Sequence, residues 1–374
     1  MSKMKIAVLK ESKPFEERVA CTPETTKKIL NLGLEVNIET NAGLSCSFLD
    51  EDYKDAGANI VKSQKMLLKD ADIILSVRRP DFNLLKQAKK NCILICQMEP
   101  NIDKDEIKKI AKLNIACFAL ELIPRITRAQ SMDVLSSQSN LAGYRAVIEA
   151  SQTYGRALPM MMTAAGTVPP AKTLVMGAGV AGLQAIATAK RLGSIVHATD
   201  VRPAAKEQVE SLGGKFLAVE DEEFREAESS GGYAKQMSAG YLKKQAKLVS
   251  ETIQNQDIVI TTALIPGKTA PKLISSKMVE SMKSGSVIVD LAAVSGGNCE
   301  LTVKDKIIDK NGVKIIGHSN FPSRLASDSS RLYSRNLFSF LENLFDKENS
   351  KVNFNLDDEI IKDTLLTHNG KIQQ

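Results

Sequence analysis

The stretch TLVMGAGVAGLQAIATAKRLGSIVHATD, residues 173–200, predicts a strand, a tight turn, a helix and a second strand. An apolar run leads directly into Gly177, Gly179 and Gly182, and the helical pattern that follows ends at Gly193. The second apolar run ends at Asp200, 18 residues after Gly182. This order is typical of a Rossmann dinucleotide-binding unit, in which an acid lies about 20 residues beyond the glycines.

The three glycines and the acid each have a physical task in such a motif. The first glycine permits the turn, the second lets backbone N–H groups approach a pyrophosphate at the positive helix end, and the third allows close helix–strand packing. Asp200 is expected to accept both ribose hydroxyls, which favours NAD over NADP because a carboxylate repels a 2′-phosphate. Arg202, two residues on, weakens that preference. The glycines alone also fit a simple connecting turn, but strand, helix and acid together predict a nucleotide site.

The size and composition of the chain indicate a globular protein of two domains. Its 374 residues are 43% hydrophobic, and domains of about 150 residues are typical. The net charge is +6, but the lysines come as separated pairs along predicted helix faces. We therefore expect a solvated surface and no nucleic-acid partner.

Targeting and metal-binding signals are absent from the sequence. No run reaches about 18 apolar residues and the amino terminus has no signal-peptide core, so a cytoplasmic chain is expected. The six cysteines include no CxxC pair and are best explained as buried thiols in a reducing compartment. The three histidines are too dispersed for a metal site, and no metal is predicted.

Short apolar strands alternate with helical segments over residues 5–120, and further strands follow Asp200. Such repeats predict parallel sheets. The predicted fold class is α/β, with two Rossmann-like, doubly wound parallel-sheet domains joined by long helices and a cofactor cleft between them. A helical pattern at 322–345 predicts a return to the first domain, which is expected to comprise residues 1–134 plus 323–374. The nucleotide-binding domain is expected to cover residues 135–322.

Four segments have compositions of their own. Residues 130–145 carry only two charges and seven Ser, Gln or Asn, which suits either a ligand-facing segment or a polar helix start between domains. The methionines at 160–162 are predicted to fill a core. The long insertion at 220–256 predicts a mobile loop, at about 220–250, whose Tyr233 closes on bound cofactor. The alternation after Asn349, with Asn369-Gly370, predicts a small hairpin or docking extension.

Long blocks of the sequence resemble one known family. RITRAQSMDVLSSQSNLAGYRAVIEA (125–150), MMMTAAGTVPPAKTLVMGAGVAGLQAIATAKRLG (160–193), ATDVR, ESLGGKF, SSGGYAKQM and ITTALIPGK are similar to the NAD(H)-binding alpha subunit, or domain I, of proton-translocating NAD(P) transhydrogenase. The resemblance covers nearly the whole chain. More distant relatives are the alanine dehydrogenases, which share the two-domain fold and the pattern KESKPFEERVACTPE (10–24).

The resemblance implies roles for individual residues. The nicotinamide end would be held by Arg125, Asp133 and Ser136, and Gln130 would reach toward a second nucleotide on a partner; these four are the predicted catalytic residues. The implied cofactor-binding residues further include Arg128, Gly177, Gly179, Val180, Gly182, Asp200, Val201, Arg202, Gly232, Tyr233 and Leu264. Among them, Gly232 and Tyr233 would belong to the mobile loop, and Leu264 would flank the adenosine or ribose.

The resemblance also separates two kinds of reaction. Alanine dehydrogenases use a substrate-binding lysine, a catalytic histidine and a catalytic aspartate, and the corresponding places here hold Arg78, Gln97 and Val294. Arg18 is retained. Oxidative deamination needs a general base, which neither Gln97 nor Val294 supplies. Hydride transfer between two nicotinamides needs no base, only closely held C4 atoms and exclusion of water.

The sequence contains one dinucleotide motif, so the second nucleotide is expected on another polypeptide. The resemblance implies NAD(H) on this chain and NADP(H) on a beta subunit joined to a proton-conducting membrane subunit. It also implies a homodimer and a peripheral position on the cytoplasmic face of the inner membrane. Because no spanning segment occurs, a split-subunit arrangement is expected. An alanine-dehydrogenase-like enzyme and a silent NADH-sensing module remain the alternatives.

Overall fold

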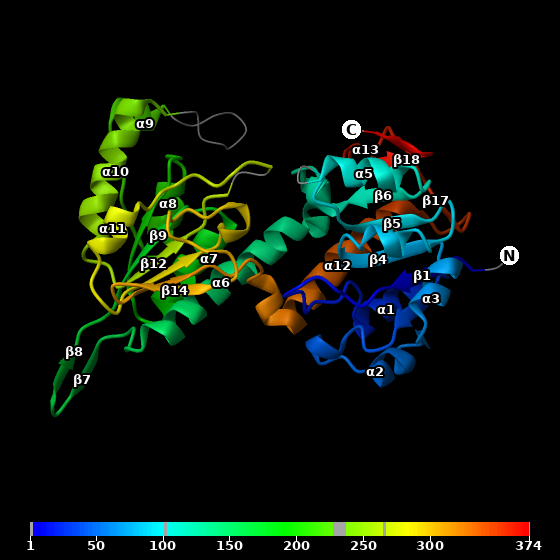
Figure 1. The fold of residues 1–374 in the computed structure, drawn as a ribbon, viewed down its shortest axis with the longest axis horizontal. Coiled ribbons are helices and arrows are strands. Elements are labelled where there is room, and N and C mark those ends of the chain that lie inside the picture. Colours follow the sequence, from blue (N-terminus) through cyan, green and yellow to red (C-terminus); the bar gives the residue numbers. More distant parts are fainter. Residues whose placement is uncertain (1–2, 101–102, 227–236, 265–266, 374) are drawn as a thin grey trace. The chain divides into compact units, whose positions relative to one another are not determined.

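The computed structural model describes residues 3–100, 103–226, 237–264 and 267–373 (Figure 1). The chain divides into two compact units. Unit 1 comprises Met1–Gln138 with Pro322–Gln374, and unit 2 comprises Ser139–Phe321. The sequence-based boundaries lie within four residues of these limits.

Unit 1 contains an eight-stranded sheet with the strand order β19-β18-β6-β5-β4-β1-β2-β3. The six amino-terminal strands are parallel, which confirms the prediction for this part of the chain. They are β1 (Lys5–Val8), β2 (Glu35–Glu39), β3 (Asn59–Val61), β4 (Ile73–Arg78), β5 (Ile93–Gln97) and β6 (Ala116–Ala119). The antiparallel hairpin of β18 (Leu365–His368) and β19 (Lys371–Ile372) extends the sheet beside β6. It turns at Asn369 and Gly370, as predicted, with φ values of 49° and 75°.

Helices cover this sheet, and four of them begin at a residue whose side chain caps the first turn. In α1 (Pro23–Asn31) the Thr22 hydroxyl accepts the Thr25 N–H, and Pro23 occupies the first turn. The other helices of unit 1 are α2 (Asp50–Asp55), α3 (Gln64–Asp70), α4 (Phe82–Leu85), α5 (Lys104–Ala111), α12 (Ala326–Leu344) and α13 (Glu359–Thr364). Short 3-10 turns lie at η1 (Leu44–Cys46), η2 (Leu120–Leu122), η3 (Thr127–Met132) and η5 (Pro322–Leu325), and a small hairpin joins β16 (Phe345–Asp346) to β17 (Lys351–Val352).

Helix α12 returns the chain to unit 1, as the leucine pattern predicted. Its apolar face is buried in the core through Leu337, Phe340, Leu341 and Leu344. Buried serines of η5 and α12 also accept hydrogen bonds from an amino-terminal segment without regular structure. The bonds run from Glu17 N–H to Ser323 Oγ (2.6 Å), from Val19 N–H to Ser330 Oγ (3.0 Å) and from Thr22 N–H to Ser334 Oγ (3.1 Å). These side chains satisfy backbone groups that no strand partner reaches.

Unit 2 contains a seven-stranded sheet with the order β11-β10-β9-β12-β13-β15-β14. The strands are β9 (Lys172–Met176), β10 (Ile195–Thr199), β11 (Lys215–Phe216), β12 (Ile258–Thr261), β13 (Val287–Asp290), β14 (Ile307–Lys310) and β15 (Val313–Ile316). The predicted strands after Asp200 are all parallel, as expected, and β14, which was not predicted, pairs antiparallel with β15 at this edge. Asn311 and Gly312 form the hairpin turn there, with φ values of 54° and 82°.

The helices of unit 2 correct the predicted loop at about 220–250. They are α6 (Val134–Tyr154), which begins in unit 1, α7 (Val180–Arg191), α8 (Ala205–Ser211), α9 (Glu222–Arg225), α10 (Ala239–Ile253) and α11 (Ser276–Glu280).

Residues 239–253 are therefore helical, with the Ser238 hydroxyl as amino-terminal cap and Tyr241, Val249 and Ile253 buried. Their helical spacing outweighed the Gly/Ser-rich context on which the loop prediction depended. Gly232 and Tyr233, assigned to a mobile lid, lie outside the described residues.

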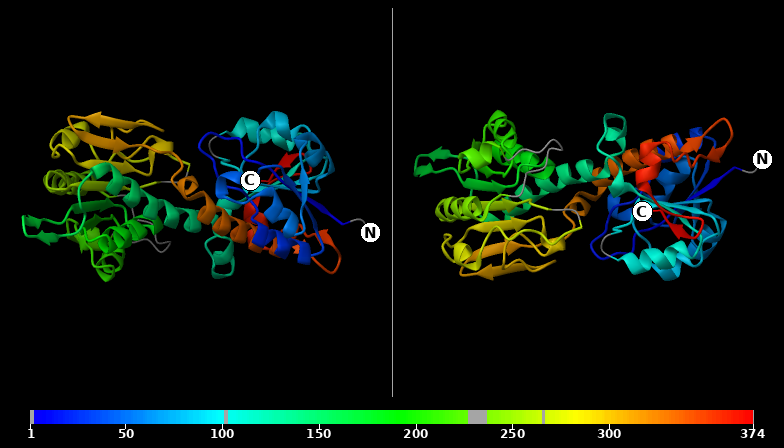
Figure 2. Two further views of the ribbon diagram at one scale, coloured as in Figure 1. Left: turned by 90° about the horizontal axis from the view of Figure 1, so that it is seen from below. Right: turned by 90° about the horizontal axis from the view of Figure 1, so that it is seen from above.

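A hairpin of β7 (Met161–Thr163) and β8 (Gly166–Val168) extends away from the rest of unit 2 (Figures 1 and 2). Within the described residues, these two strands pair only with each other. Met160, Met161 and Met162 are 59%, 43% and 79% exposed. The prediction that they fill a core was wrong, because the hairpin stands apart from the sheet and helices of the unit.

The remaining compositional expectations concern cysteines and membrane spans. Cys21, Cys46, Cys92, Cys96, Cys117 and Cys299 are buried free thiols, as predicted. Burial raises the pKa of Cys92 and Cys117 to about 12, so these thiols are unreactive near neutral pH. Across the ranges that the structure describes, no helix combines the length and apolarity needed to cross a bilayer.

An ion pair fixes η3 to the carboxy-terminal segment of unit 1. Arg128 donates from Nη1 and Nη2 to the two carboxylate oxygens of Asp358, at 3.1 and 2.6 Å. These bonds, together with one from Asn343, lower the pKa of Asp358 from 3.8 to about 2. Because the pKa is lowered in the folded protein, the stabilisation is present above pH 3.8 and is lost as the pH falls through about 2.

We predict that Asp358→Asn lowers the free energy of unfolding at neutral pH by up to ~1 kcal/mol, the range of exposed ion pairs. The difference between variant and wild type should shrink as the pH falls below 3.8 and vanish below about pH 2, where the wild-type carboxyl also becomes neutral. Urea unfolding of both proteins across this pH range measures it. A difference that stays constant down to about pH 2 would contradict the assignment.

Candidate functional site

The dinucleotide motif forms the turn between β9 and α7, as predicted. Gly177 has φ 103°, and a Cβ there would lie 2.5 Å from Thr262 Oγ1. A Cβ on Gly182 would lie 1.8 Å from the Gly177 carbonyl oxygen. These two glycines are therefore required by the protein's own packing.

Gly179 differs from its two neighbours in the motif. It caps the start of α7 with φ −76° and ψ −169°, which any residue adopts, and a Cβ there would meet no atom of the described residues within 4 Å. Val180, the first residue of α7, is 42% exposed. Among the described residues, the space beside Gly179 at the amino-terminal end of this 12-residue helix is therefore open, and the free N–H groups and dipole there favour an anion.

Asp200 follows β10 and its carboxylate joins two loops. Oδ2 accepts the Ala178 N–H at 2.7 Å, which connects the acid directly to the glycine turn. Oδ1 accepts the Arg202 backbone N–H and Nε, both at 2.9 Å, and Oδ2 also accepts Arg202 Nη2 at 3.0 Å. Since two carboxylate oxygens offer about four acceptor sites, ribose hydroxyls would have to replace part of the Arg202 contacts.

Arg202 is thus engaged by Asp200 in this conformation. The guanidinium is 31% exposed and the carboxylate only 7%. A side chain paired in this way neutralises the acid and is not presented to solvent as an independent cation. Val201, between the two, is 39% exposed at the same edge.

A third loop, after β12, completes the edge. Of this loop, only Leu264 was assigned to the site from the sequence. Thr262 donates from its N–H to the Met176 carbonyl at 2.9 Å and from its hydroxyl to the Gly177 carbonyl at 3.0 Å. Leu264, two residues on, is 47% exposed. The structure therefore brings the motif glycines, Asp200 and Leu264 to the carboxyl ends of β9, β10 and β12. That edge includes the point where strand order reverses and ligands of open α/β sheets bind.

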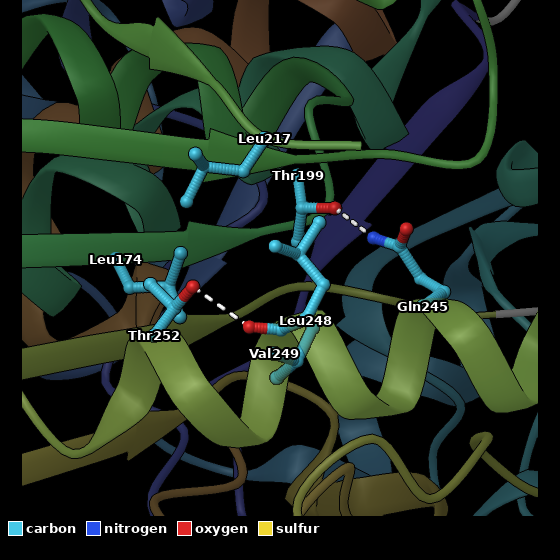
Figure 3. Close-up of a pocket in the computed structure, with 7 residues that line it drawn as sticks. All are labelled: Leu174, Thr199, Leu217, Gln245, Leu248, Val249 and Thr252. Carbon is cyan, nitrogen blue, oxygen red and sulfur yellow. Dashed lines mark hydrogen bonds between the residues drawn. The ribbon is translucent and has the colours of Figure 1, made fainter. Parts of the chain in front are cut away.

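Helix α10 is fixed behind this edge (Figure 3). Gln245 Nε2 donates to Thr199 Oγ1 at 2.7 Å, and Gln245 Oε1 accepts the Val219 N–H at 3.1 Å. Around them, Leu174, Leu217, Leu248 and Val249 pack so closely that no space for a water molecule remains between them. This contact supports β10, the strand that precedes Asp200, but it is a packed interface and not a ligand site.

The predicted nicotinamide-end residues belong to unit 1, around η3 and the start of α6. Asp133 Oδ1 accepts the Ser136 N–H at 2.9 Å and Oδ2 accepts the Ser136 hydroxyl at 2.5 Å. Asp133 therefore caps helix α6 in addition to any binding role. Arg125 and Gln130 are exposed, whereas Arg128 is paired with Asp358.

The corresponding sheet edge of unit 1 is filled by the protein's own side chains. Glu11 accepts the N–H groups of Val77 and Arg78 at 2.6 and 3.3 Å, directly between the ends of β1 and β4, where strand order reverses. Arg18 is 3% exposed and is held by both carboxylate oxygens of Glu16. Burial, with Glu16 nearby, raises the pKa of Glu11 to about 8.

Two further side chains, Arg78 and Gln97, are those that the sequence comparison with alanine dehydrogenases singled out. Arg78 is paired with Glu99 at 2.6 Å. Gln97, which has no titratable group, has a buried Oε1 that accepts no hydrogen bond from the residues that the structure describes. Within the same described ranges, no three His, Cys, Asp or Glu side chains are grouped so as to hold a metal ion.

Two family models match the chain. The N-terminal domain of the alanine dehydrogenase/PNT family matches residues 7–142, and the C-terminal domain matches residues 146–374. An NAD(P) transhydrogenase subunit alpha of Rhodospirillum rubrum is 52% identical over 374 residues, covering 99% of this chain and 97% of that protein. The protein of the same name from Rickettsia prowazekii is 51% identical, covering 99% of this chain and 96% of that protein.

Solved structures agree with these sequence matches. The transhydrogenase from Sinorhizobium meliloti superposes with a TM-score of 0.90 at 50% identity, covering 98% of this chain and 99% of that chain. An L-alanine dehydrogenase shares the fold, with a TM-score of 0.82 at 23% identity, covering 99% and 96% of the two chains. The chain belongs to the alanine dehydrogenase/PNT family and, within it, to the alpha subunits of NAD(P) transhydrogenase.

Proposed function

We propose that this chain binds NAD(H) and passes hydride from NADH directly to NADP⁺ held by a separate subunit of a proton-translocating transhydrogenase. The observation that carries the proposal is the open start of α7 at Gly179, next to Asp200. Backbone N–H groups that can bind a pyrophosphate therefore lie beside an acid that can bind a ribose, at the point where the strand order of unit 2 reverses.

The proposed reaction needs no proton donor or acceptor from this chain. Hydride leaves C4 of NADH, which becomes NAD⁺, and adds to C4 of NADP⁺, which becomes NADPH. The protein's part is to hold and orient the dihydronicotinamide and to exclude water. We assign this part to Arg125, Asp133 and Ser136, and the approach to the second nucleotide to Gln130.

The unit 1 sheet edge argues against an enzyme that oxidises an amino acid by itself. By resemblance, the positions of the dehydrogenase histidine and aspartate hold Gln97 in unit 1 and Val294 in unit 2, and neither side chain can accept a proton. The retained Arg18 is buried and already bound to Glu16 and Gln138, so it does not offer a free guanidinium to a substrate carboxylate.

The adenosine end is assigned to the loops around Asp200. In this proposal Asp200, Val201 and Arg202 receive the ribose, Leu264 flanks it, and Gly177, Gly179, Val180 and Gly182 form the pyrophosphate turn. Because Arg202 is paired with Asp200, NADH is expected to bind more tightly than NADPH.

The single dinucleotide motif argues for a second nucleotide on another polypeptide, and the similarity to transhydrogenase alpha subunits supports the identity of the partners. NADP(H) is assigned to a beta subunit that also connects the complex to a proton-conducting membrane subunit. The chain itself would then be peripheral, at the cytoplasmic face of the membrane. We further propose a homodimer in which the exposed, uncharged hairpin at 160–170 contacts a second copy.

The function is tested by mixing the purified chain with an NADP(H)-binding subunit and following transfer from NADH to an NADP analogue. We expect a rate above that of either component alone, and tighter binding of NADH than of NADPH by the isolated chain. A mixture no faster than its components would contradict hydride transfer. NADH binding without transfer in any complex would favour the sensor alternative.

The two kinds of glycine give a matched pair of variants. Gly179→Ala should leave the thermal midpoint unchanged, because its Cβ meets no atom of the described chain, yet weaken NADH binding about 10-fold or more by obstructing the pyrophosphate. Gly182→Ala should lower the thermal midpoint, because its Cβ would overlap the Gly177 carbonyl. NADH fluorescence titration and thermal unfolding measure both. Unchanged affinity in Gly179→Ala would remove the site from this helix end.

The hairpin contact is tested with a charge. Met162→Asp should convert the homodimer to monomers, because a carboxylate would be buried in an apolar interface. Met66→Asp is the matched control, since Met66 is also exposed, at 68% against 79% for Met162, but lies on α3. Sedimentation velocity distinguishes the species. A dimer that survives Met162→Asp would exclude the hairpin as the contact.

A further inference from the structure

A buried polar cluster lies beside the proposed nucleotide site, at the carboxyl ends of β12 and β13. Its two central residues, Asp290 and Asn298, are both 0% exposed. Neither is among the predicted site residues. The role inferred for this cluster rests on the proposed function, because it concerns the shape of the NADH-binding edge.

Asp290, the last residue of β13, organises the loop that follows it. Oδ1 accepts the Thr261 hydroxyl and the Ala292 N–H, each at 3.0 Å. Oδ2 accepts the Cys299 N–H at 3.0 Å and the Thr302 hydroxyl at 2.7 Å. One carboxylate thus holds both ends of the loop and the end of the neighbouring strand β12. These four bonds compensate for its burial.

The loop approaches this carboxylate closely. Gly297 has φ 80°, and a Cβ there would lie 2.7 Å from Asp290 Oδ2. On the outer side, Lys272 Nζ donates to the Gly296 and Gly297 carbonyls at 2.6 and 2.9 Å. The backbone that leads into Asn298 is therefore fixed on both sides.

Asn298 uses this fixed position to hold a second segment. Its Oδ1 accepts the Ala263 N–H at 3.1 Å, and its Nδ2 donates to the carbonyls of Ala263 and Pro271, both at 2.8 Å. All three bonds go to the segment that starts where β12 ends. Ala263 is held through both of its backbone polar groups, as a residue in a sheet would be.

Ala263 lies between Thr262, which contacts the glycine turn, and Leu264, a residue of the proposed site. Thr262 is bonded to the Gly177 carbonyl of the glycine turn, and Leu264 is half exposed at the edge. A side chain that fixes Ala263 therefore fixes the direction in which Leu264 leaves the sheet. Because about half of the Leu264 side chain is solvated, its own packing contributes little to that direction.

We propose that Asn298, held in place by Asp290, is a positioning residue for NADH binding: it fixes Ala263 so that Leu264 forms a rigid wall of the nucleotide site. Preorganisation of this kind strengthens binding by removing the cost of ordering the loop when the ligand arrives. A cluster with a purely structural role would instead stabilise the fold and leave affinity unchanged.

The first variant is Asn298→Asp, which preserves shape but replaces the donor with an acceptor facing two carbonyl oxygens. We expect NADH dissociation constants to rise about 10-fold or more at neutral pH. Lowering the pH should restore part of the affinity, because a protonated carboxyl in that position can donate to one of the carbonyls. Wild-type affinity should not follow this pH profile.

The matched control is Thr302→Val, which removes one hydroxyl donor to Asp290 on the same loop but none of the three Asn298 bonds. We expect a lowered thermal midpoint and an NADH affinity within about twofold of the wild type. If Asn298→Asp loses thermal stability but keeps wild-type affinity, the positioning role is wrong. Equal losses of affinity in both variants would also overturn it, because they would indicate a general loosening of the fold.

A second variant covers the case in which Asn298→Asp does not fold. Leu264→Ala truncates a half-exposed side chain, so folding is expected to be intact, and NADH binding should weaken several-fold, about 1 kcal/mol at a factor of five. Wild-type affinity in Leu264→Ala would overturn the inference. A wild-type chain that binds no NADH would overturn the proposed function first, and the inference with it.

Discussion

Everything at the nucleotide edge depends on how closely the backbone of α7 approaches the turn after β9. A single Cβ at Gly182 would overlap the Gly177 carbonyl, and one at Gly143 of α6 would lie 2.0 Å from the Ala181 carbonyl. Two helices are thus brought together by glycines at the same point. Because α7 lies this close to the turn, its first N–H groups lie near the strand ends. Asp200 can then accept a hydrogen bond directly from the turn, at Ala178.

The roles of residues within one continuous segment could be predicted from the sequence. The roles of residues that bond to segments distant in the sequence could not. The glycine turn, the α7 helix and Asp200 form one continuous segment, and their spacing alone predicted them. Thr262, Asp290 and Asn298 act on the same edge through hydrogen bonds to distant segments, which no local pattern reveals. The exposure of Met162 is a further case: the identity of the residue predicts burial, but only tertiary structure decides whether anything lies against it.

The two units share one architecture but differ at the sheet edge where the strand order reverses, which is the usual ligand position of this fold. In unit 1, the space between the ends of β1 and β4 is occupied by Glu11, and the nearby Arg18 is bound internally by Glu16. In unit 2, the described residues leave the equivalent space in front of Gly179 open. A shared fold therefore says little about chemistry, and the difference arises from which side chains follow the strands.

The buried serines of α12 have a consequence for how the chain acquires its structure during synthesis. Unit 1 needs Ser330 and Ser334 to satisfy backbone groups near Val19 and Thr22, and β18 to pair with β6. These segments leave the ribosome only after the whole of unit 2, which is continuous in sequence. Unit 2 can therefore complete its core first, while residues 1–138 complete theirs only once α12 and β18 have been synthesised.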